Sequence, residues 1–359
     1  MTLPMDKKTI IPALALGVFL SWNACTTKPL EVKADSDYVT FMGRTYVTDD
    51  GGVGFNYPGV TAMLRFKGER VDMLTSPGSG YYVVQIDGGE PRKVLVADDD
   101  SVVTVADYLT DGEHELRITY AIEGYEKNPV IRGFVLPRGG RVLEAPEKGE
   151  LKIEFIGNSI TCGYGAEVSD GEGSFSYDTE NFCNTYAYLT GRALDADVNV
   201  VARSGIGIYR NYNGPRDGDI WGTMPMEYDH TMVYDTIHSW DFSRFQPDIV
   251  CINLGTNDAS TDNYDISLFE AEYDRFLTRL RGYYPSAKIV LLSGCMLQGR
   301  PLEDVKGVLD RLSERHEGTY RFDMSPQTGE LGMGVNNHPS PGQHKKMADE
   351  LTEYLKTIM

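Results

Sequence analysis

The stretch Leu151–Gly165, with the sequence LKIEFIGNSITCGYG, decides the fold of the second half of the chain. Its β-favouring residues Ile153, Phe155 and Ile156 indicate a buried strand, which runs directly into a Gly-Asn-Ser turn. In an open α/β sheet, ligands bind at the carboxyl ends of the strands. Ser159 in this turn is therefore a candidate nucleophile, although a serine in such a place can also serve only as a helix cap.

Beyond this stretch, strand-like runs alternate with amphipathic runs. Strands are expected at 153–156, 198–202, 248–254, 288–292 and 320–322, and helices at 185–194, 268–283, 303–315 and about 341–358. The alternation predicts a doubly wound α/β/α domain with a mostly parallel sheet over residues 151–359. A segment without clear period lies between 206 and 243, and loops of this length are usually functional or mobile.

Residues 36–140 follow a different pattern, in which short alternating runs are separated by turn clusters. Such runs occur at 61–66, 81–86, 92–96, 102–105, 116–120 and 131–136. They predict an all-β sandwich, and residues 137–149 read as the connection to the second domain.

Composition excludes some classes of function. The 359 residues include 53 acidic and 34 basic side chains, a net charge of −19 that argues against a nucleic-acid partner. Hydrophobic residues make up 41% of the chain and charged residues 24%, which is typical of a folded protein. The absence of CxxC and HExxH patterns gives no indication of a metal site.

The amino terminus has the pattern of a secretory signal over residues 1–25. Lys7 and Lys8 precede the apolar run 10–20, which is too short for a stable membrane span. Cys25 further resembles the lipidated cysteine of a bacterial lipoprotein, although Trp22 replaces the usual leucine. We expect export to the outer membrane, periplasm or cell surface, with a lipid anchor as the only membrane attachment; plain secretion is the alternative.

Four further cysteines follow Cys25. Cys251 and Cys295 lie in apolar runs and are expected to be buried small hydrophobic residues. Cys162 and Cys183 flank a loop beside the candidate site, and an oxidising compartment would permit a disulfide bond between them.

Three more groups follow predicted strands or precede the last helix. SGIG with Gly205 comes after 198–202, GTND with Asn257 comes after 248–254, and His338 stands before the last helix. Serine acyl transfer needs a base and hydrogen-bond donors for the oxyanion, which these residue types supply. Taken singly, Gly205 and Asn257 are ordinary turn residues and His338 an ordinary surface histidine. Their joint occurrence in this order indicates a catalytic site.

The blocks GNSIT, SGIG, LGTND and HPSPGQH together resemble those of the SGNH (GDSL-type) hydrolase superfamily, over residues 151–359. A sandwich before them, with FMGRTY at 41–46, is similar to carbohydrate esterase family 2. Members of that family join a jelly-roll domain to an SGNH domain and deacetylate polysaccharides. The resemblance therefore implies a jelly-roll sandwich for residues 36–140.

The resemblance implies that Ser159 is the nucleophile and His338 the general base, with no cofactor. The oxyanion hole would consist of the Ser159 and Gly205 backbone N–H groups and the Asn257 side-chain amide. The superfamily's aspartate three residues before the histidine is Val335 here, and a valine side chain cannot orient an imidazole. Either a backbone carbonyl orients His338, giving a Ser-His dyad, or another carboxylate does.

Substrate contacts are predicted from position alone. Tyr164, Tyr209 and Trp221 lie next to the blocks or in the long loop, where they can stack on sugar rings, and Asp258 can accept a sugar hydroxyl. Packing is the alternative role for each aromatic residue. For the sandwich domain we favour support of the cleft over carbohydrate binding.

The sequence thus predicts an exported bacterial esterase that removes O-acetyl groups from an acetylated polysaccharide such as xylan or mannan. One alternative is an SGNH esterase for a sialate, peptidoglycan or lipid ester. Another is a carbohydrate-binding protein with a degenerate site, which Val335 favours and the four intact block residues oppose. Surface adhesion is a third alternative, based only on the possible lipid anchor.

Overall fold

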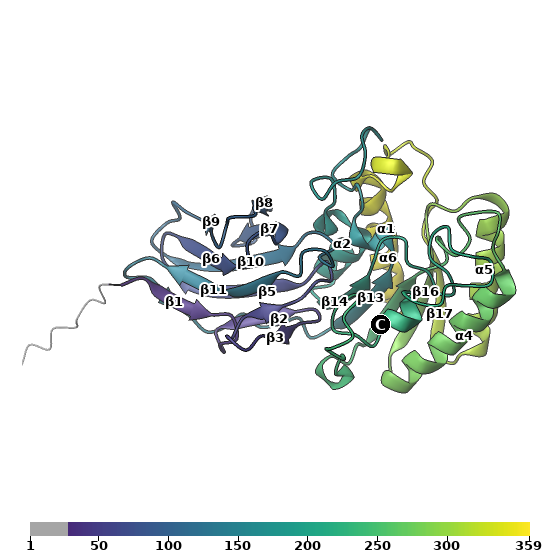
Figure 1. Ribbon diagram of the computed structural model, residues 1–359, viewed down its shortest axis with the longest axis horizontal. Helices are drawn as coiled ribbons and strands as arrows, with labels where there is room; N and C mark the ends of the chain where they lie inside the picture. Colours follow the sequence, from purple (N-terminus) through teal and green to yellow (C-terminus); the bar gives the residue numbers. More distant parts are fainter. Residues whose placement is uncertain (1–27) are drawn as a thin grey trace, which may run out of the picture.

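The computed structural model describes residues 28–359, in which an all-β domain precedes an α/β domain (Figure 1). The predicted signal over residues 1–25 and the predicted lipidation of Cys25 lie outside the described residues. No helix within the described range is long and apolar enough to span a bilayer.

The first domain is a sandwich of two antiparallel sheets, as the sequence predicts. One sheet has the order β3 (Tyr46–Val47), β4 (Val53–Gly54), β11 (Val130–Leu136), β6 (Val71–Thr75) and β9 (Val102–Ala106), with β1 (Leu30–Lys33) also paired to β11. The other has the order β12 (Arg141–Val142), β5 (Thr61–Lys67), β10 (Glu113–Tyr120), β7 (Gly80–Ile86) and β8 (Arg92–Val96), with β2 (Val39–Met42) also paired to β5. Because β1 and β12 belong to it, the sandwich extends beyond the expected limits of 36 and 140.

The second domain contains one parallel sheet, which confirms the predicted doubly wound fold. Its strand order is β14 (Asp197–Ala202), β13 (Lys152–Gly157), β15 (Ile249–Asn253), β16 (Lys288–Ser293) and β17 (Thr319–Asp323). The chain leaves β13 for β14 on one side and then crosses to β15 on the other. The carboxyl end of β13 is therefore a topological switch point, where such sheets bind ligands.

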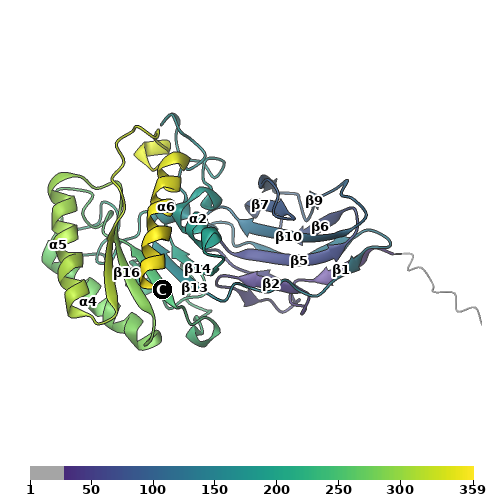
Figure 2. The ribbon, with the colours of Figure 1, turned by 180° about the vertical axis from the view of Figure 1, so that it is seen from behind.

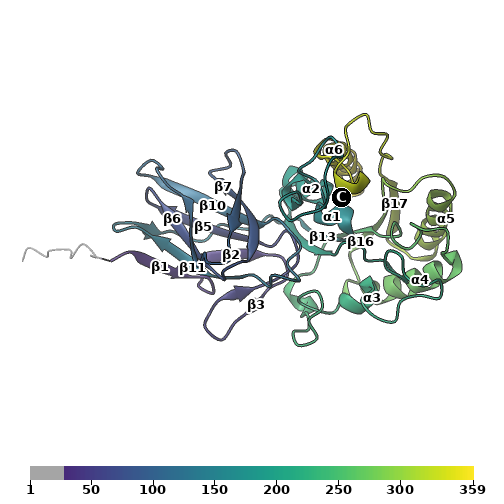
Figure 3. The ribbon, with the colours of Figure 1, turned by 45° about the horizontal axis from the view of Figure 1, so that its top comes forward.

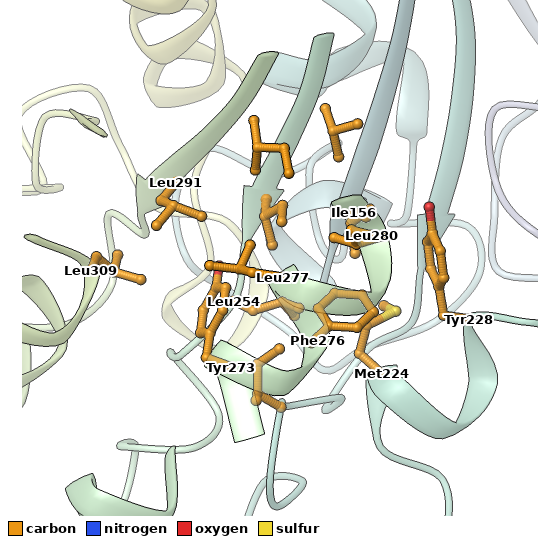
Figure 4. Close-up of a cluster of buried hydrophobic side chains, with 14 of the residues drawn as sticks. Ile156, Met224, Tyr228, Leu254, Tyr273, Phe276, Leu277, Leu280, Leu291 and Leu309 are labelled. Atoms are coloured by element: carbon orange, nitrogen blue, oxygen red, sulfur yellow. The ribbon is translucent and has the colours of Figure 1, made fainter. Parts of the chain in front are cut away.

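Helices cover both faces of this sheet (Figures 2 and 3). On one face lie α2 (Tyr186–Ala193) and α6 (Pro341–Ile358), and on the other lie α4 (Ile266–Tyr283) and α5 (Gly299–Arg315). Figure 4 shows the second interface, where Tyr273, Phe276, Leu277 and Leu280 of α4 are buried beside Ile156 and Leu291 of the sheet. Their i, i+3, i+4, i+7 spacing is the helical period that the sequence shows.

Cys162 and Cys183 are both buried free thiols in the structure. The disulfide bond that the sequence permits between Cys162 and Cys183 is therefore not formed. Burial also raises the pKa of the Cys183 thiol to about 12, so this group behaves as a small apolar core residue.

A buried ion pair joins the two domains. Arg44, in the turn after β2, places its guanidinium 3.3 Å from a carboxylate oxygen of Glu154 on β13, and neither side chain is exposed. The same guanidinium donates to the His230 carbonyl (2.9 Å) and lies over the rings of Tyr228 and Trp240. An arginine inside a protein needs such partners because the loss of hydration is costly. This contact fixes the sandwich against the strand that precedes Ser159.

We expect Arg44→Met to lower the free energy of unfolding by about 3 kcal/mol, because it leaves the Glu154 carboxylate buried without its cation. Urea denaturation followed by circular dichroism measures the change. Arg65→Met is the matched control, since Arg65 pairs with Glu113 at the surface and should change stability little. Equal stability of the Arg44→Met and Arg65→Met proteins would show that the buried contact between Arg44 and Glu154 does not stabilise the fold.

Candidate active site

Ser159 stands at the carboxyl end of β13 and begins the short helix α1 (Ser159–Cys162). The Asn158 side chain caps this helix by accepting a hydrogen bond from the Ile160 N–H (3.0 Å). A side chain at Gly157 would lie 2.0 Å from the Thr161 hydroxyl oxygen, so only glycine permits this turn. The turn leaves Ser159 at the rim of the sheet, as the sequence predicts.

His338 contacts Ser159 directly. Its Nε2 lies 2.9 Å from the Ser159 Oγ, and its Nδ1 lies 3.1 Å from the backbone carbonyl oxygen of Val335. Because a carbonyl only accepts, Nδ1 carries the proton and Nε2 has the free lone pair that a general base needs. Of the two alternatives left open by Val335, the structure thus has the backbone carbonyl orienting the imidazole.

Tyr164 holds the imidazole from one side. Its ring stacks on His338 with centroids 4.1 Å apart, and its hydroxyl accepts a hydrogen bond from the Asn336 amide (2.8 Å). Phe175 stacks on Tyr164 at 4.2 Å. Tyr164 lines the same cleft as Ser159, in agreement with its predicted place. Because rings pack against both of its faces, it has no free face for a sugar ring, and its placement indicates a role in positioning His338.

The predicted oxyanion-hole groups lie in the same cleft. A cleft of about 390 Å³ has Ser159, Gly205, Asn257 and His338 in its lining. Gly205 has a φ of +76°, in the left-handed region that favours glycine, and its N–H has no protein acceptor among residues 28–359. Asn257 donates one amide hydrogen to the Ile206 carbonyl (2.8 Å), which orients the amide and leaves its second hydrogen available.

Asp258 and Tyr209 do not line this cleft. The Asp258 carboxylate is buried and accepts hydrogen bonds from the backbone N–H groups of Ile208 and Tyr209, both at 2.9 Å. Burial raises its pKa to about 6. The Tyr209 hydroxyl accepts from the Asp265 N–H (2.8 Å). Both side chains hold the long loop in place, so this geometry gives them structural roles in place of the predicted sugar contacts.

Trp221 lies on the surface of the long loop, 65% exposed, with its ring 5.6 Å from that of Tyr234. It is not in the cleft lining. The aromatic residue that does line the cleft with a large exposed area is Tyr212, which is 58% exposed. Tyr212 was not singled out from the sequence, although its position in the long loop, five residues after the SGIG block, was the available signal.

Comparison with known families agrees with this architecture. Residues 41–146 match the family described as "Carbohydrate esterase 2 N-terminal". Residues 155–355 match the "GDSL-like Lipase/Acylhydrolase family". The two matches correspond to the sandwich and to the α/β domain.

Individual relatives resemble the chain over most of its length. It is 33% identical over 329 residues to the cellulase/esterase CelE of Acetivibrio thermocellus, covering 90% of this chain but only 40% of that longer protein. It is 30% identical over 362 residues to an acetylxylan esterase / glucomannan deacetylase of Cellvibrio japonicus, covering 98% and 99% of the two chains. A family two carbohydrate esterase from Clostridium thermocellum, solved in complex with cellohexaose, superposes with a TM-score of 0.82 at 32% identity, covering 89% and 98%.

The acid limb of the pH profile tests the state of His338. Burial lowers the pKa of His338 to about 4 from its usual 6.5, so the imidazole is neutral and can accept a proton at all pH values above this. We expect kcat/KM for an aryl acetate to rise through about pH 4 and to stay level from about pH 6 to 8. An inflection of kcat/KM near pH 6.5 would show that burial does not lower the pKa of His338. Circular dichroism at each pH controls for acid unfolding.

Proposed function

Because the chain belongs to carbohydrate esterase family 2, we propose that it removes O-acetyl groups from a polysaccharide such as xylan or mannan. The family makes it a carboxylic-ester hydrolase. The observation that carries the proposal is the 2.9 Å contact between the Ser159 hydroxyl and the unprotonated nitrogen of His338. Its relatives include acetylxylan esterase / glucomannan deacetylases of Cellvibrio japonicus, which supports an acetylated polysaccharide as substrate.

Acylation begins with attack of the Ser159 Oγ on the acetyl carbonyl carbon, while His338 Nε2 takes the hydroxyl proton. The carbonyl oxygen becomes an oxyanion, which accepts hydrogen bonds from the Ser159 and Gly205 N–H groups and the Asn257 amide. When the C–O bond to the sugar breaks, His338 gives its proton to the departing sugar oxygen. The products of this half-reaction are a free sugar hydroxyl and an acetyl-enzyme.

Deacylation repeats these steps with water in place of Ser159. His338 Nε2 takes a proton from the water, whose oxygen attacks the acetyl carbon, and the same donors hold the oxyanion. Collapse of this intermediate releases acetic acid and returns the proton to the Ser159 Oγ. The Val335 carbonyl stabilises the imidazolium in both steps less than a carboxylate would, because it carries only a partial negative charge.

Sugar recognition is assigned to Tyr212. Its ring lines the cleft that contains Ser159 and is more than half exposed, so its face is available to the apolar face of a sugar. Trp221 and Tyr234 lie together further along the same long loop and offer a second aromatic surface for a longer polysaccharide.

We assign the protein to the outside of the cell, since a polysaccharide of this kind does not cross a membrane. The signal pattern over residues 1–25 provides for export, and Cys25 provides for a lipid anchor. Incorporation of a labelled fatty acid into the wild-type protein, and not into Cys25→Ala, would distinguish anchoring from plain secretion.

Ser159→Ala should reduce acetate release from acetylated xylan by at least about a thousandfold, because it removes the nucleophile. Chromatography of free acetate measures the rate. Ser267→Ala is the matched control: this serine is exposed at the start of α4 and should leave the rate unchanged. Comparable rates for Ser159→Ala and the wild type would exclude this mechanism.

Tyr212→Ala should raise KM for acetylated xylan roughly threefold to tenfold, because the lost stacking is worth about 1 kcal/mol. KM for a small aryl acetate, which does not need the sugar surface, should change less. Tyr108→Ala, at a 95% exposed tyrosine of the sandwich, is the control and should leave both values unchanged. An equal rise for the two substrates would show that Tyr212 does not recognise sugar.

A further inference from the structure

Glu123 is a sandwich residue whose side chain contacts the candidate active site. It lies in the loop between β10 and β11, and only 3% of it is exposed. Its carboxylate accepts two hydrogen bonds from Ser204 of the α/β domain, one from the backbone N–H and one from the hydroxyl. Glu123 takes no part in the acyl-transfer steps, and it lies outside the four sequence blocks that supply Ser159, Gly205, Asn257 and His338.

The loop that carries Glu123 is fastened to the α/β domain on both sides. The Ala121 carbonyl, two residues before it, accepts a hydrogen bond from the Phe182 N–H (2.8 Å). On the other side, the Asn56 carbonyl accepts from the Gly124 N–H (2.9 Å), and the Asn56 side chain exchanges two hydrogen bonds with the backbone of Val233 (2.8 and 3.1 Å). The Glu123 carboxylate therefore has a fixed position relative to Ser204.

The peptide unit between Ser204 and Gly205 carries the Gly205 N–H of the oxyanion hole. In a planar trans peptide the N–H points opposite to the preceding C=O. The Ser204 carbonyl accepts a hydrogen bond from Arg203 (3.0 Å), and Glu123 holds the N–H and hydroxyl of the same serine. Contacts on both sides of Ser204 thus determine where the Gly205 N–H points.

A second buried acid supports this arrangement. The Glu180 carboxyl is fully buried beside Glu123; burial and the charge of Glu123 raise its pKa well above the usual range. Two neighbouring carboxyls in the interior do not both ionise readily. Burial raises the pKa of Glu123 as well, but the two donors from Ser204 favour its ionised form, so the charge is better placed on Glu123 and the proton on Glu180.

We propose that Glu123 is a positioning residue for the oxyanion hole, through which the sandwich domain holds the Ser204–Gly205 peptide in its productive orientation. The inference rests on the proposed oxyanion hole of Ser159, Gly205 and Asn257. It gives the sandwich a part in the reaction, although the residues that line the cleft all belong to the α/β domain. Glu123 itself touches neither the substrate nor the reacting atoms.

Glu123→Gln tests the proposal, since the amide keeps the shape but can accept only one of the two hydrogen bonds well. We expect kcat for an aryl acetate to fall roughly tenfold to a hundredfold, with KM within about twofold of wild type. Affinity for an arylboronic acid, whose adduct with Ser159 places an oxygen in the hole, should fall in the same proportion. The matched control is Glu126→Gln, an exposed acid in the same loop, which should change neither quantity.

Ser204→Ala provides a second route if Glu123→Gln does not fold. It removes one donor to Glu123 and should lower kcat roughly threefold to tenfold, again at constant KM. In the Ser204→Ala background, Glu123→Gln should cost less than it does in the wild type, because the two residues act through one contact. A loss of kcat that only follows the folded fraction seen by circular dichroism would overturn the proposal.

Asn257→Ala distinguishes an error in the proposed oxyanion hole from an error in the role proposed for Glu123. If it leaves kcat unchanged, the proposed oxyanion hole is wrong. If it lowers kcat while Glu123→Gln and Ser204→Ala leave kcat and arylboronic acid affinity unchanged, the oxyanion hole stands and the role of Glu123 is wrong. Loss of kcat in all three variants supports both.

Discussion

The buried contact between Arg44 and Glu154 is the constraint on which the arrangement of the two domains depends. The Arg44 guanidinium is fully buried, so only its carboxylate and carbonyl partners can replace the water that it has lost. All of these partners lie in the α/β domain. Glu154 stands on β13, the strand that ends at Ser159. The ion pair thus fixes the sandwich relative to Ser159 and lets the loop with Glu123 reach Ser204.

His338, the proposed general base, is oriented without a carboxylate. The Val335 carbonyl fixes the tautomer of His338, while the stacked ring of Tyr164 fixes its plane. Asn336 and Asn337, both with positive φ, form the turn that brings this carbonyl under the imidazole. A neutral carbonyl does not offset the cost of charging a buried imidazole as an anion would, which is why burial dominates the lowered pKa of His338.

The long segment 206–243 forms part of the cleft and is tied to the neighbouring loop 254–265. The Asp258 carboxylate accepts from backbone N–H groups at its start, and Arg210, fully buried, donates to the carbonyls of Asp258 and Asn263 (2.8 and 2.6 Å). Buried charges with several partners of this kind hold irregular backbone in one arrangement. A loop without helical or strand period can therefore present Tyr212 in the cleft.

The sequence alone determined both folds, most helices and strands, and the residues now found together at Ser159, because periodicity, turn residues and motif order are local properties of the chain. Strand β6 was not among the strands predicted from the sequence, because its short apolar run is interrupted by an acidic residue. Only the tertiary structure decided that the Val335 carbonyl serves His338, that Asp258 and Tyr209 support a loop, and that Glu123 contacts Ser204. The Val335 carbonyl is only three residues from His338, but it reaches the imidazole through a turn in which Asn336 and Asn337 have positive φ, which the sequence pattern does not specify. The other roles depend on groups up to 81 residues apart meeting across packed elements, which no local pattern specifies.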